Sequence, residues 1–299
     1  MVDRLFIIGI DGVDFSIAED QGILLDSTVK WDLKEFPKLH TLRIWPSMYL
    51  GEYPHKNEHL VDPLESKQST SSGANWYSSE MRALSRISSY VIPKKVRKYI
   101  GKKMIMGNVA KTEPDRGNWD NTVFDNISSK AINLPAYNPL SVQKRLKESW
   151  DVEIASENAG LEALEEIAEE EREQVRAELL KATERGYDLT WGYIYGTDIF
   201  GHIDFQYGYP RQVEKTVAEV INPLREELNE GDELVVISDH GMEEKNGAGV
   251  HRPPGWLTTT MSDESLPQTP PEVRQWIEGK IGDRSKEVEQ TLQDLGYID

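Results

Sequence analysis

Three aspartates stand at or just after the ends of short apolar runs, where a carboxylate can take part in chemistry. They are Asp11, Asp198 and Asp239. The apolar runs have the length and composition of buried parallel strands, whose carboxyl ends share one edge of a sheet. Ligands bind at that edge in sheets of this kind, so we expect the three carboxylates to meet there.

Three of the six histidines follow these aspartates in a pattern. His202 comes four residues after Asp198, which places both side chains on one face if the chain turns helically after the strand. His240 directly follows Asp239, and His251 lies beyond a glycine-rich loop. Carboxylates and imidazoles gathered in this way are typical ligands of a divalent metal ion.

We expect two divalent ions at this edge of the sheet, each with room left for a substrate. The chain contains no cysteine, so the ligands are oxygen and imidazole groups, which suit Zn²⁺, with Mn²⁺ as the alternative. One predicted site consists of Asp11, Asp239, His240 and a hydroxyl group. The other consists of Asp198, His202 and His251.

The remaining pattern is one of alternating strands and helices along 299 residues. We predict strands over 4–10, 131–134, 190–195 and 233–238, and helices within 41–54 and over 121–129, 157–185, 212–228, 270–280 and 285–295. This alternation favours an α/β fold with a mostly parallel central sheet and helices on both faces. The chain lacks a secretory leader pattern and an apolar run of about 18 residues, so we expect a cytoplasmic location.

Charge is distributed unevenly along the chain. The formal net charge of −18 disfavours general binding of nucleic acids. In contrast, residues 67–111 carry ten basic side chains and one acidic one, Glu80, for a net charge of +9. We interpret 61–117 as a basic insertion or cap. It is either a solvated insertion or a lid whose lysines attract an anionic substrate or a membrane surface.

Six stretches, in this order, resemble the alkaline phosphatase superfamily, and most closely its type I phosphodiesterase/nucleotide pyrophosphatase branch. They are IGIDG at 8–12, 41–54, AINLPAYNP at 131–139, 195–202, VISDHGM at 236–242 and HRPPG at 251–255. The resemblance covers roughly 1–60 and 118–260. It implies a single alkaline phosphatase-like domain over 1–299, with 61–117 inserted within it, and a metal-dependent hydrolase of phosphate esters.

The family's nucleophile is a threonine or serine ten residues before the glycine of a TGxYP-like turn. That glycine corresponds to Gly51, which makes Thr41 the predicted nucleophile and metal ligand, with Ser47 as its rival. The chain departs from the family at Leu50, where a hydroxyl residue is usual. The resemblance implies that Thr41, activated by a metal ion, forms a covalent phospho-threonine that water then hydrolyses.

The resemblance favours a phosphodiesterase or nucleotide pyrophosphatase acting on an anionic small-molecule ester. A phosphomonoesterase, a sulfatase or a phosphotransferase on the same core remain alternatives, because the fold does not choose among them. The sulfatase branch is disfavoured, since the chain has neither a cysteine nor an SxPxR motif at Thr41. A non-catalytic binding protein is the alternative of a different class. Asn57 and Arg252 are predicted donors to substrate oxygens.

Overall fold

A computed structural model describes residues 2–53, 56, 121–125, 127–153, 159–245, 248–262 and 265–281. The predicted insertion at 61–117 and the predicted helix at 285–295 lie outside these ranges. No helix within them has the length and apolar character needed to span a membrane.

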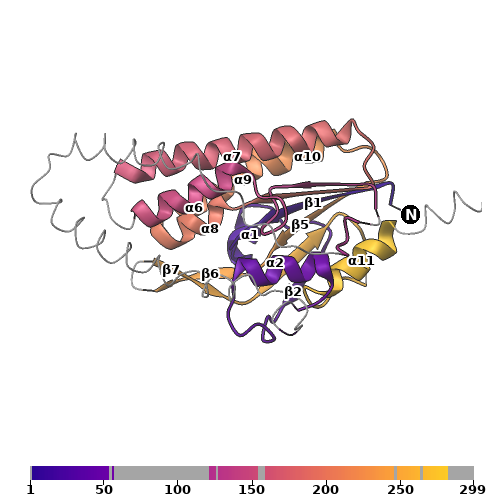
Figure 1. Cartoon of the computed structure of the whole chain (residues 1–299), viewed down its shortest axis with the longest axis horizontal. Helices are drawn as coiled ribbons and strands as arrows, with labels where there is room; N and C mark the ends of the chain where they lie inside the picture. The colour runs from indigo at the N-terminus through magenta and orange to yellow at the C-terminus, as the bar shows by residue number, and fades with distance from the viewer. Residues whose placement is uncertain are drawn as a thin grey trace, which may run out of the picture.

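A six-stranded sheet forms the centre of the molecule (Figure 1), in the order β2-β8-β5-β1-β4-β3. Strand β1 pairs in parallel with β4 and β5, and β3 pairs in parallel with β4. Strand β8 runs antiparallel to both β5 and β2. The strands are β1 Arg4–Ile10, β2 Ser27–Trp31, β3 Ser129–Ile132, β4 Leu189–Ile194, β5 Asp232–Ser238 and β8 Gly255–Thr259. The mostly parallel α/β fold predicted from the sequence is therefore confirmed.

Helices cover both faces of this sheet (Figure 1), with α6, α7, α9 and α10 on one side and α2 and α11 on the other. A short antiparallel ribbon of β6 and β7 lies apart from the main sheet. The remaining elements are α1 Phe15–Asp20, α2 Thr41–Leu50, α6 Ser141–Glu153, α7 Ala159–Thr183, α8 Gly196–Ile203, α9 Gly208–Thr216, the π-helix η2 Val217–Ile221, α10 Asn222–Glu227, β6 Gly241–Lys245, β7 Ala248–Arg252 and α11 Glu272–Ile281.

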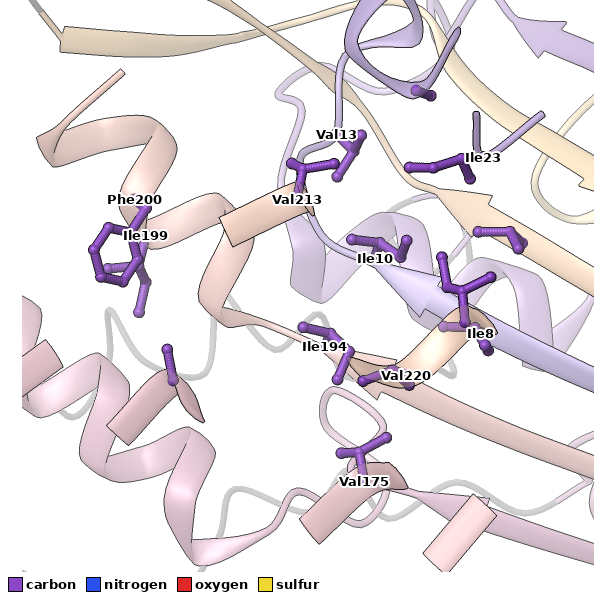
Figure 2. Close-up of a cluster of buried hydrophobic side chains, with 14 of the residues drawn as sticks. Ile8, Ile10, Val13, Ile23, Val175, Ile194, Ile199, Phe200, Val213 and Val220 are labelled. Atoms are coloured by element: carbon purple, nitrogen blue, oxygen red, sulfur yellow. The ribbon is translucent and has the colours of Figure 1, made fainter. Parts of the chain in front are cut away.

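The side chains of β1 show why the molecule has two apolar layers. Phe6, Ile8 and Ile10 belong to the core beneath α7 and α9, part of which is drawn in Figure 2. Leu5 and Ile7 alternate with them and belong to the core beneath α2 and α11. Successive side chains of a strand point to opposite faces, so a continuous apolar run fills both layers. Burial on both sides fixes β1 at the middle of the sheet.

Most predicted elements are confirmed to within a few residues, including the long helix α7. The helix predicted over 121–129 is wrong. Asn121 adopts a φ of 68°, and the carboxylate of Asp125 accepts a hydrogen bond from the amide of Thr122. Such local side-chain bonds favour turns over helix. Strand β3 then begins at Ser129, two residues before the predicted strand.

Candidate metal centre

Asp11 and Asp239 meet because they follow neighbouring parallel strands, β1 and β5. The turn after β1 contacts the end of β5 directly: Gly12 donates its amide to Asp239 Oδ1 at 3.2 Å. Gly12 has a φ of +66°, and a Cβ there would lie 2.7 Å from Asp198 Oδ1. Glycine is therefore required both by the backbone conformation and by the close approach of a third carboxylate.

Helix α8 begins two residues after β4 and carries the predicted pair Asp198 and His202. His202 Nε2 lies 3.5 Å from Asp198 Oδ1, the proximity that a four-residue helical spacing predicts. The start of the helix is also tied to β1, because Thr197 donates its hydroxyl to the carbonyl of Asp11 at 2.6 Å.

The ribbon of β6 and β7 brings His251 to the same place from a distant part of the sequence. Its Nε2 lies 3.1 Å from Asp198 Oδ1 and 2.8 Å from His202 Nε2. Its ring also stacks on that of His240, with centroids 3.9 Å apart. The structure thus brings together all six carboxylates and imidazoles that the sequence pattern singled out.

All three imidazoles are oriented in the same way. The Nδ1 atom of each lies within hydrogen-bond distance of a backbone carbonyl: His202 with Gly249 at 2.9 Å, His240 with Gly241 at 3.2 Å, and His251 with Leu39 at 3.0 Å. A neutral imidazole that donates from Nδ1 has its lone pair on Nε2. The three Nε2 atoms are thereby directed into the cluster, which is the usual orientation of metal-binding histidines.

The ligand atoms form two overlapping groups. Within each group, the ligand atoms lie within 4.8 Å of one another. One group is Asp11, Asp239 and His240, and the other is Asp198, His240 and His251. The first matches a predicted site. In the second, His240 joins the predicted pair of Asp198 and His251, while His202 adjoins it through its contacts with both. His240 therefore belongs to both groups, and its Nε2 lies 3.6 Å from Asp11 Oδ1 and 4.0 Å from Asp198 Oδ1.

The electrostatics of the cluster suit a cation. Burial and the charges of Asp239 and Asp198 raise the pKa of Asp11 well above its usual value. Two further polar atoms, Asp239 Oδ2 and His240 Nε2, are buried without a hydrogen-bond partner. Buried carboxylates close together repel one another, and orphaned lone pairs are costly, unless a cation binds them. The residues present therefore fit a divalent metal ion.

Asp198 and His251 form the most strongly coupled pair. Burial alone would raise the pKa of Asp198 and lower that of His251. Their mutual contact, together with the other histidines around Asp198 and with Leu39 and Asp239 around His251, lowers the pKa of Asp198 to about 2 and raises that of His251 to about 9. A metal ion and a proton therefore compete for Nε2 of His251, since metal ligation requires the neutral imidazole.

Thr41 is the first residue of α2, and its Oγ1 donates to both oxygens of Asp11, at 3.2 and 3.1 Å. His40 precedes it as the N-cap, and its Nδ1 accepts a hydrogen bond from Leu42. Burial lowers the pKa of His40 to about 4. The rival Ser47 is fully buried within the helix and donates to the carbonyl of Ile44 at 2.6 Å.

Tyr193 is a site residue that the sequence reasoning missed. Its phenol lies on β4 and donates to Asp11 Oδ2 at 2.6 Å, so it holds the oxygen that also accepts from Thr41. Burial and the neighbouring charges of Asp11 and Asp239 raise its pKa well above the usual range, which keeps the phenol protonated. An aromatic residue within an apolar strand gives no sequence signal that separates this role from core packing.

The two predicted substrate donors are placed differently. Arg252 binds Asp14 through two nitrogens, at 2.9 and 2.8 Å, and Asp14 in turn caps α1 through the amide of Ser16. In this arrangement Arg252 links the β7 ribbon to the turn after β1. Asn57 lies outside the described residues.

The fold and the site define an α/β protein with a cluster of candidate metal ligands at the carboxyl edge of its sheet. The chain belongs to the type I phosphodiesterase/nucleotide pyrophosphatase family, whose family model matches residues 22–294. This match confirms the resemblance found in the sequence motifs and supports a hydrolase acting on phosphate esters. A search of curated proteins returned no significant match.

Proposed function

We propose that this protein is a metal-dependent phosphodiesterase or nucleotide pyrophosphatase that works through a covalent phospho-threonine at Thr41. Two divalent ions, zinc or else manganese, would be held by Asp11, Thr41, Asp239 and His240 and by Asp198, His202 and His251. The observation that carries this proposal is the common orientation of the three imidazoles, whose Nδ1 atoms all face backbone carbonyls. Their Nε2 atoms therefore converge on three buried carboxylates.

The position of Thr41 supports its role as nucleophile. Its hydroxyl hydrogen is directed at Asp11, so the oxygen can attack phosphorus and displace the alcohol of the ester while the hydroxyl proton passes to a carboxylate. Thr41 also stands in the first turn of α2, where backbone amides and the helix dipole favour an anionic group. Bound divalent cations would supply stabilisation of the alkoxide and of the leaving oxygen.

A substrate screen tests the reaction class. The full chain, reconstituted with Zn²⁺ or Mn²⁺, is assayed on a phosphodiester, a phosphomonoester and a sulfate ester that share one leaving group. We expect the phosphodiester to have the highest kcat/KM and activity to disappear after chelation. A preference for the monoester or the sulfate would move the protein to another branch, and no turnover of any ester would favour a binding protein.

A pair of variants tests the nucleophile. Thr41→Ala should reduce turnover by at least about a thousandfold, the range seen when a catalytic nucleophile is removed. Ser47→Ala is the matched control, because it removes a hydroxyl from the same helix, and it should hydrolyse the diester at a rate near that of the wild type. The opposite ranking of the two variants would transfer the nucleophile to Ser47.

A further inference from the structure

Glu171 is a buried carboxylate that lies outside the candidate metal groups. It sits in the middle of α7 with no exposed surface, whereas Glu173 on the same helix is exposed. Placing a carboxylate out of contact with water is costly unless several hydrogen bonds satisfy it. The burial of Glu171 therefore needs a structural explanation, whereas the exposed acidic residues of α7 do not.

The partners of Glu171 are at the start of α8. Its Oε1 accepts from the amide of Tyr195 at 3.1 Å, and its Oε2 accepts from the amide of Gly196 at 2.9 Å. The first amides of a helix have no partner within that helix, and α8 has no side-chain cap of its own at Tyr195. Glu171 supplies the missing acceptor from another helix, and its negative charge suits the helix dipole.

The same carboxylate is fixed from a third direction. Asn133 donates from Nδ2 both to Glu171 Oε1 and to the carbonyl of Tyr193, at 2.9 Å each. There is little spare room around the contact, because a Cβ on Gly196 would lie 3.3 Å from Glu171 Oε2 and 3.2 Å from Ala168 Cβ. The bonds therefore fix the position at which α8 begins relative to α7 and β4.

Helix α8 carries Asp198 and His202, two and six residues beyond Gly196. Any shift or fraying of its first turn moves the Asp198 carboxylate away from His251. We propose that Glu171 is a positioning residue, which holds Asp198 and His202 in place for metal binding by capping α8 from α7. This inference rests on the proposed metal-dependent function.

Hydrogen exchange of the wild-type chain in chelator tests the cap itself, without any metal. Amides at the start of a short helix usually exchange quickly, because they lack partners. We expect the amides of Tyr195 and Gly196 to exchange as slowly as those in the middle of β4. Rapid exchange at both positions would overturn the inference, whatever the variants show.

Titration with Zn²⁺ then tests the positioning role, using Glu171→Gln and the control Glu173→Gln. Both substitutions replace a carboxyl group of α7 with an amide, but only the first replaces an acceptor oxygen of the cap with an amide donor. We expect Glu171→Gln to weaken one of the two Zn²⁺ binding steps by about 10- to 100-fold, the usual effect of losing a group that orients a ligand. In Glu171→Gln, the backbone amides of α8 should exchange their hydrogens faster than in the wild type, while those of α11 should exchange at an unchanged rate.

The outcomes separate this inference from the proposed function. A purely structural role would move both binding steps together, or neither, and would contradict the proposal. Equal Zn²⁺ affinities in wild type and Glu171→Gln would overturn the inference and leave the proposed function intact. A wild-type chain that takes up no Zn²⁺ would overturn the proposed function and this inference with it.

Discussion

Five of the seven candidate ligands are held by a second group that fixes their orientation. Tyr193 holds Asp11, the amide of Gly12 holds Asp239, and a backbone carbonyl holds each histidine. Such outer partners set the direction of a ligand's lone pairs and raise metal affinity. Much of the site's chemistry therefore depends on residues that are not themselves ligands.

Tyr193→Phe tests the contact between the phenol of Tyr193 and Asp11. The substitution keeps the ring that packs against Trp45 but removes the hydroxyl that binds Asp11. We expect Zn²⁺ affinity to fall by about tenfold or more, with the fold retained, as measured by calorimetric titration. Tyr187→Phe, just before the opposite end of β4, is the control and should bind Zn²⁺ like the wild type. Unchanged affinity in Tyr193→Phe would contradict the proposed role of the phenol.

Glu171 gives a prediction for the dependence of stability on pH. Burial raises its pKa to about 7, from the ordinary value of 4.5, although the amides of Gly196 and Tyr195 and the side chain of Asn133 act in the opposite direction. Because the folded-state pKa is raised, the contribution of Glu171 to the free energy of unfolding is fully present below pH 4.5 and is lost as the pH rises through 7.

The difference in unfolding free energy between wild type and Glu171→Gln isolates this effect, because glutamine does not ionise. In chelator, the wild type should lose stability relative to Glu171→Gln as the pH rises from about 4.5 to 7.5. The loss should be on the order of 3 kcal/mol, at about 1.4 kcal/mol per pKa unit. Denaturant titrations at a series of pH values measure it. A difference that does not change with pH would show that Glu171 does not titrate in this window.

At the residue scale, the sequence revealed the ligands but not their partners. Asp11 and Asp239 were predictable because each directly follows a strand, and Asp198 because it precedes His202 by four residues in the turn of helix after β4. The family spacing identified Thr41. Tyr193 and Glu171 were not predictable, because an aromatic residue in a strand and an acid on a helix have ordinary structural explanations. Their roles depend on contacts between segments far apart in the sequence, which spacing does not encode.

The contact between α8 and the β6–β7 ribbon is the element-level feature on which the histidines depend. Gly249 of β7 accepts a hydrogen bond from His202 Nδ1, and a Cβ at Gly249 would lie 2.2 Å from the carbonyl oxygen of Gly201. Because both sides of this contact are backbone, no side chain can move to relieve such a clash. The two elements can approach closely only with glycine at this point.

Gly249→Ala should therefore destabilise the protein by about 1–3 kcal/mol, the usual cost of overpacking, and weaken Zn²⁺ binding through His202. Thermal unfolding and Zn²⁺ titration measure the two effects. Gly279→Ala in α11 is the matched control: nothing lies within 4 Å of its added methyl group, and the change should stabilise the helix by about 0.5–1 kcal/mol. Equal effects of the two substitutions would argue against a close contact between α8 and β7.

Element prediction worked where a pattern was long or fully apolar. The periodicity of α7 and the apolar runs of β1, β4 and β5 carried enough signal to locate them. The prediction failed at 121–129, where Asp125 captures the amide of Thr122. The region predicted as one helix over 212–228 begins at Gly208 and contains a π-helical turn, η2. Local side-chain bonds and packing decided these cases, and neither produces a distinct periodicity.

At the scale of the whole molecule, the two apolar layers hold the sheet in place while its carboxyl edge carries mutually repelling charge. Asp11, Asp198 and Asp239 are buried together, an arrangement that costs stability until a cation offsets it. Metal binding should therefore contribute to the stability of the entire fold, since the site joins β1, β5, α8 and β7.

Thermal unfolding with and without metal tests this coupling. At a free Zn²⁺ concentration about 100 times the dissociation constant, binding should add about 2.7 kcal/mol per site, so chelation should lower the Tm by several degrees. Asp239→Asn should unfold at a higher Tm than the wild type in chelator and show a smaller rise with Zn²⁺. A Tm that is the same in Zn²⁺ and in chelator would mean that the ions do not bind the native fold.

Diffraction from Zn²⁺-loaded crystals, with data collected above and below the zinc absorption edge, tests the central claim most directly. The account predicts two anomalous peaks per chain, one among Asp11, Asp239, His240 and Thr41 Oγ1 and one among Asp198, His202 and His251, with ligand distances of about 2.0–2.2 Å. Zinc bound only elsewhere on the chain, or no zinc within reach of the three buried carboxylates, would contradict it.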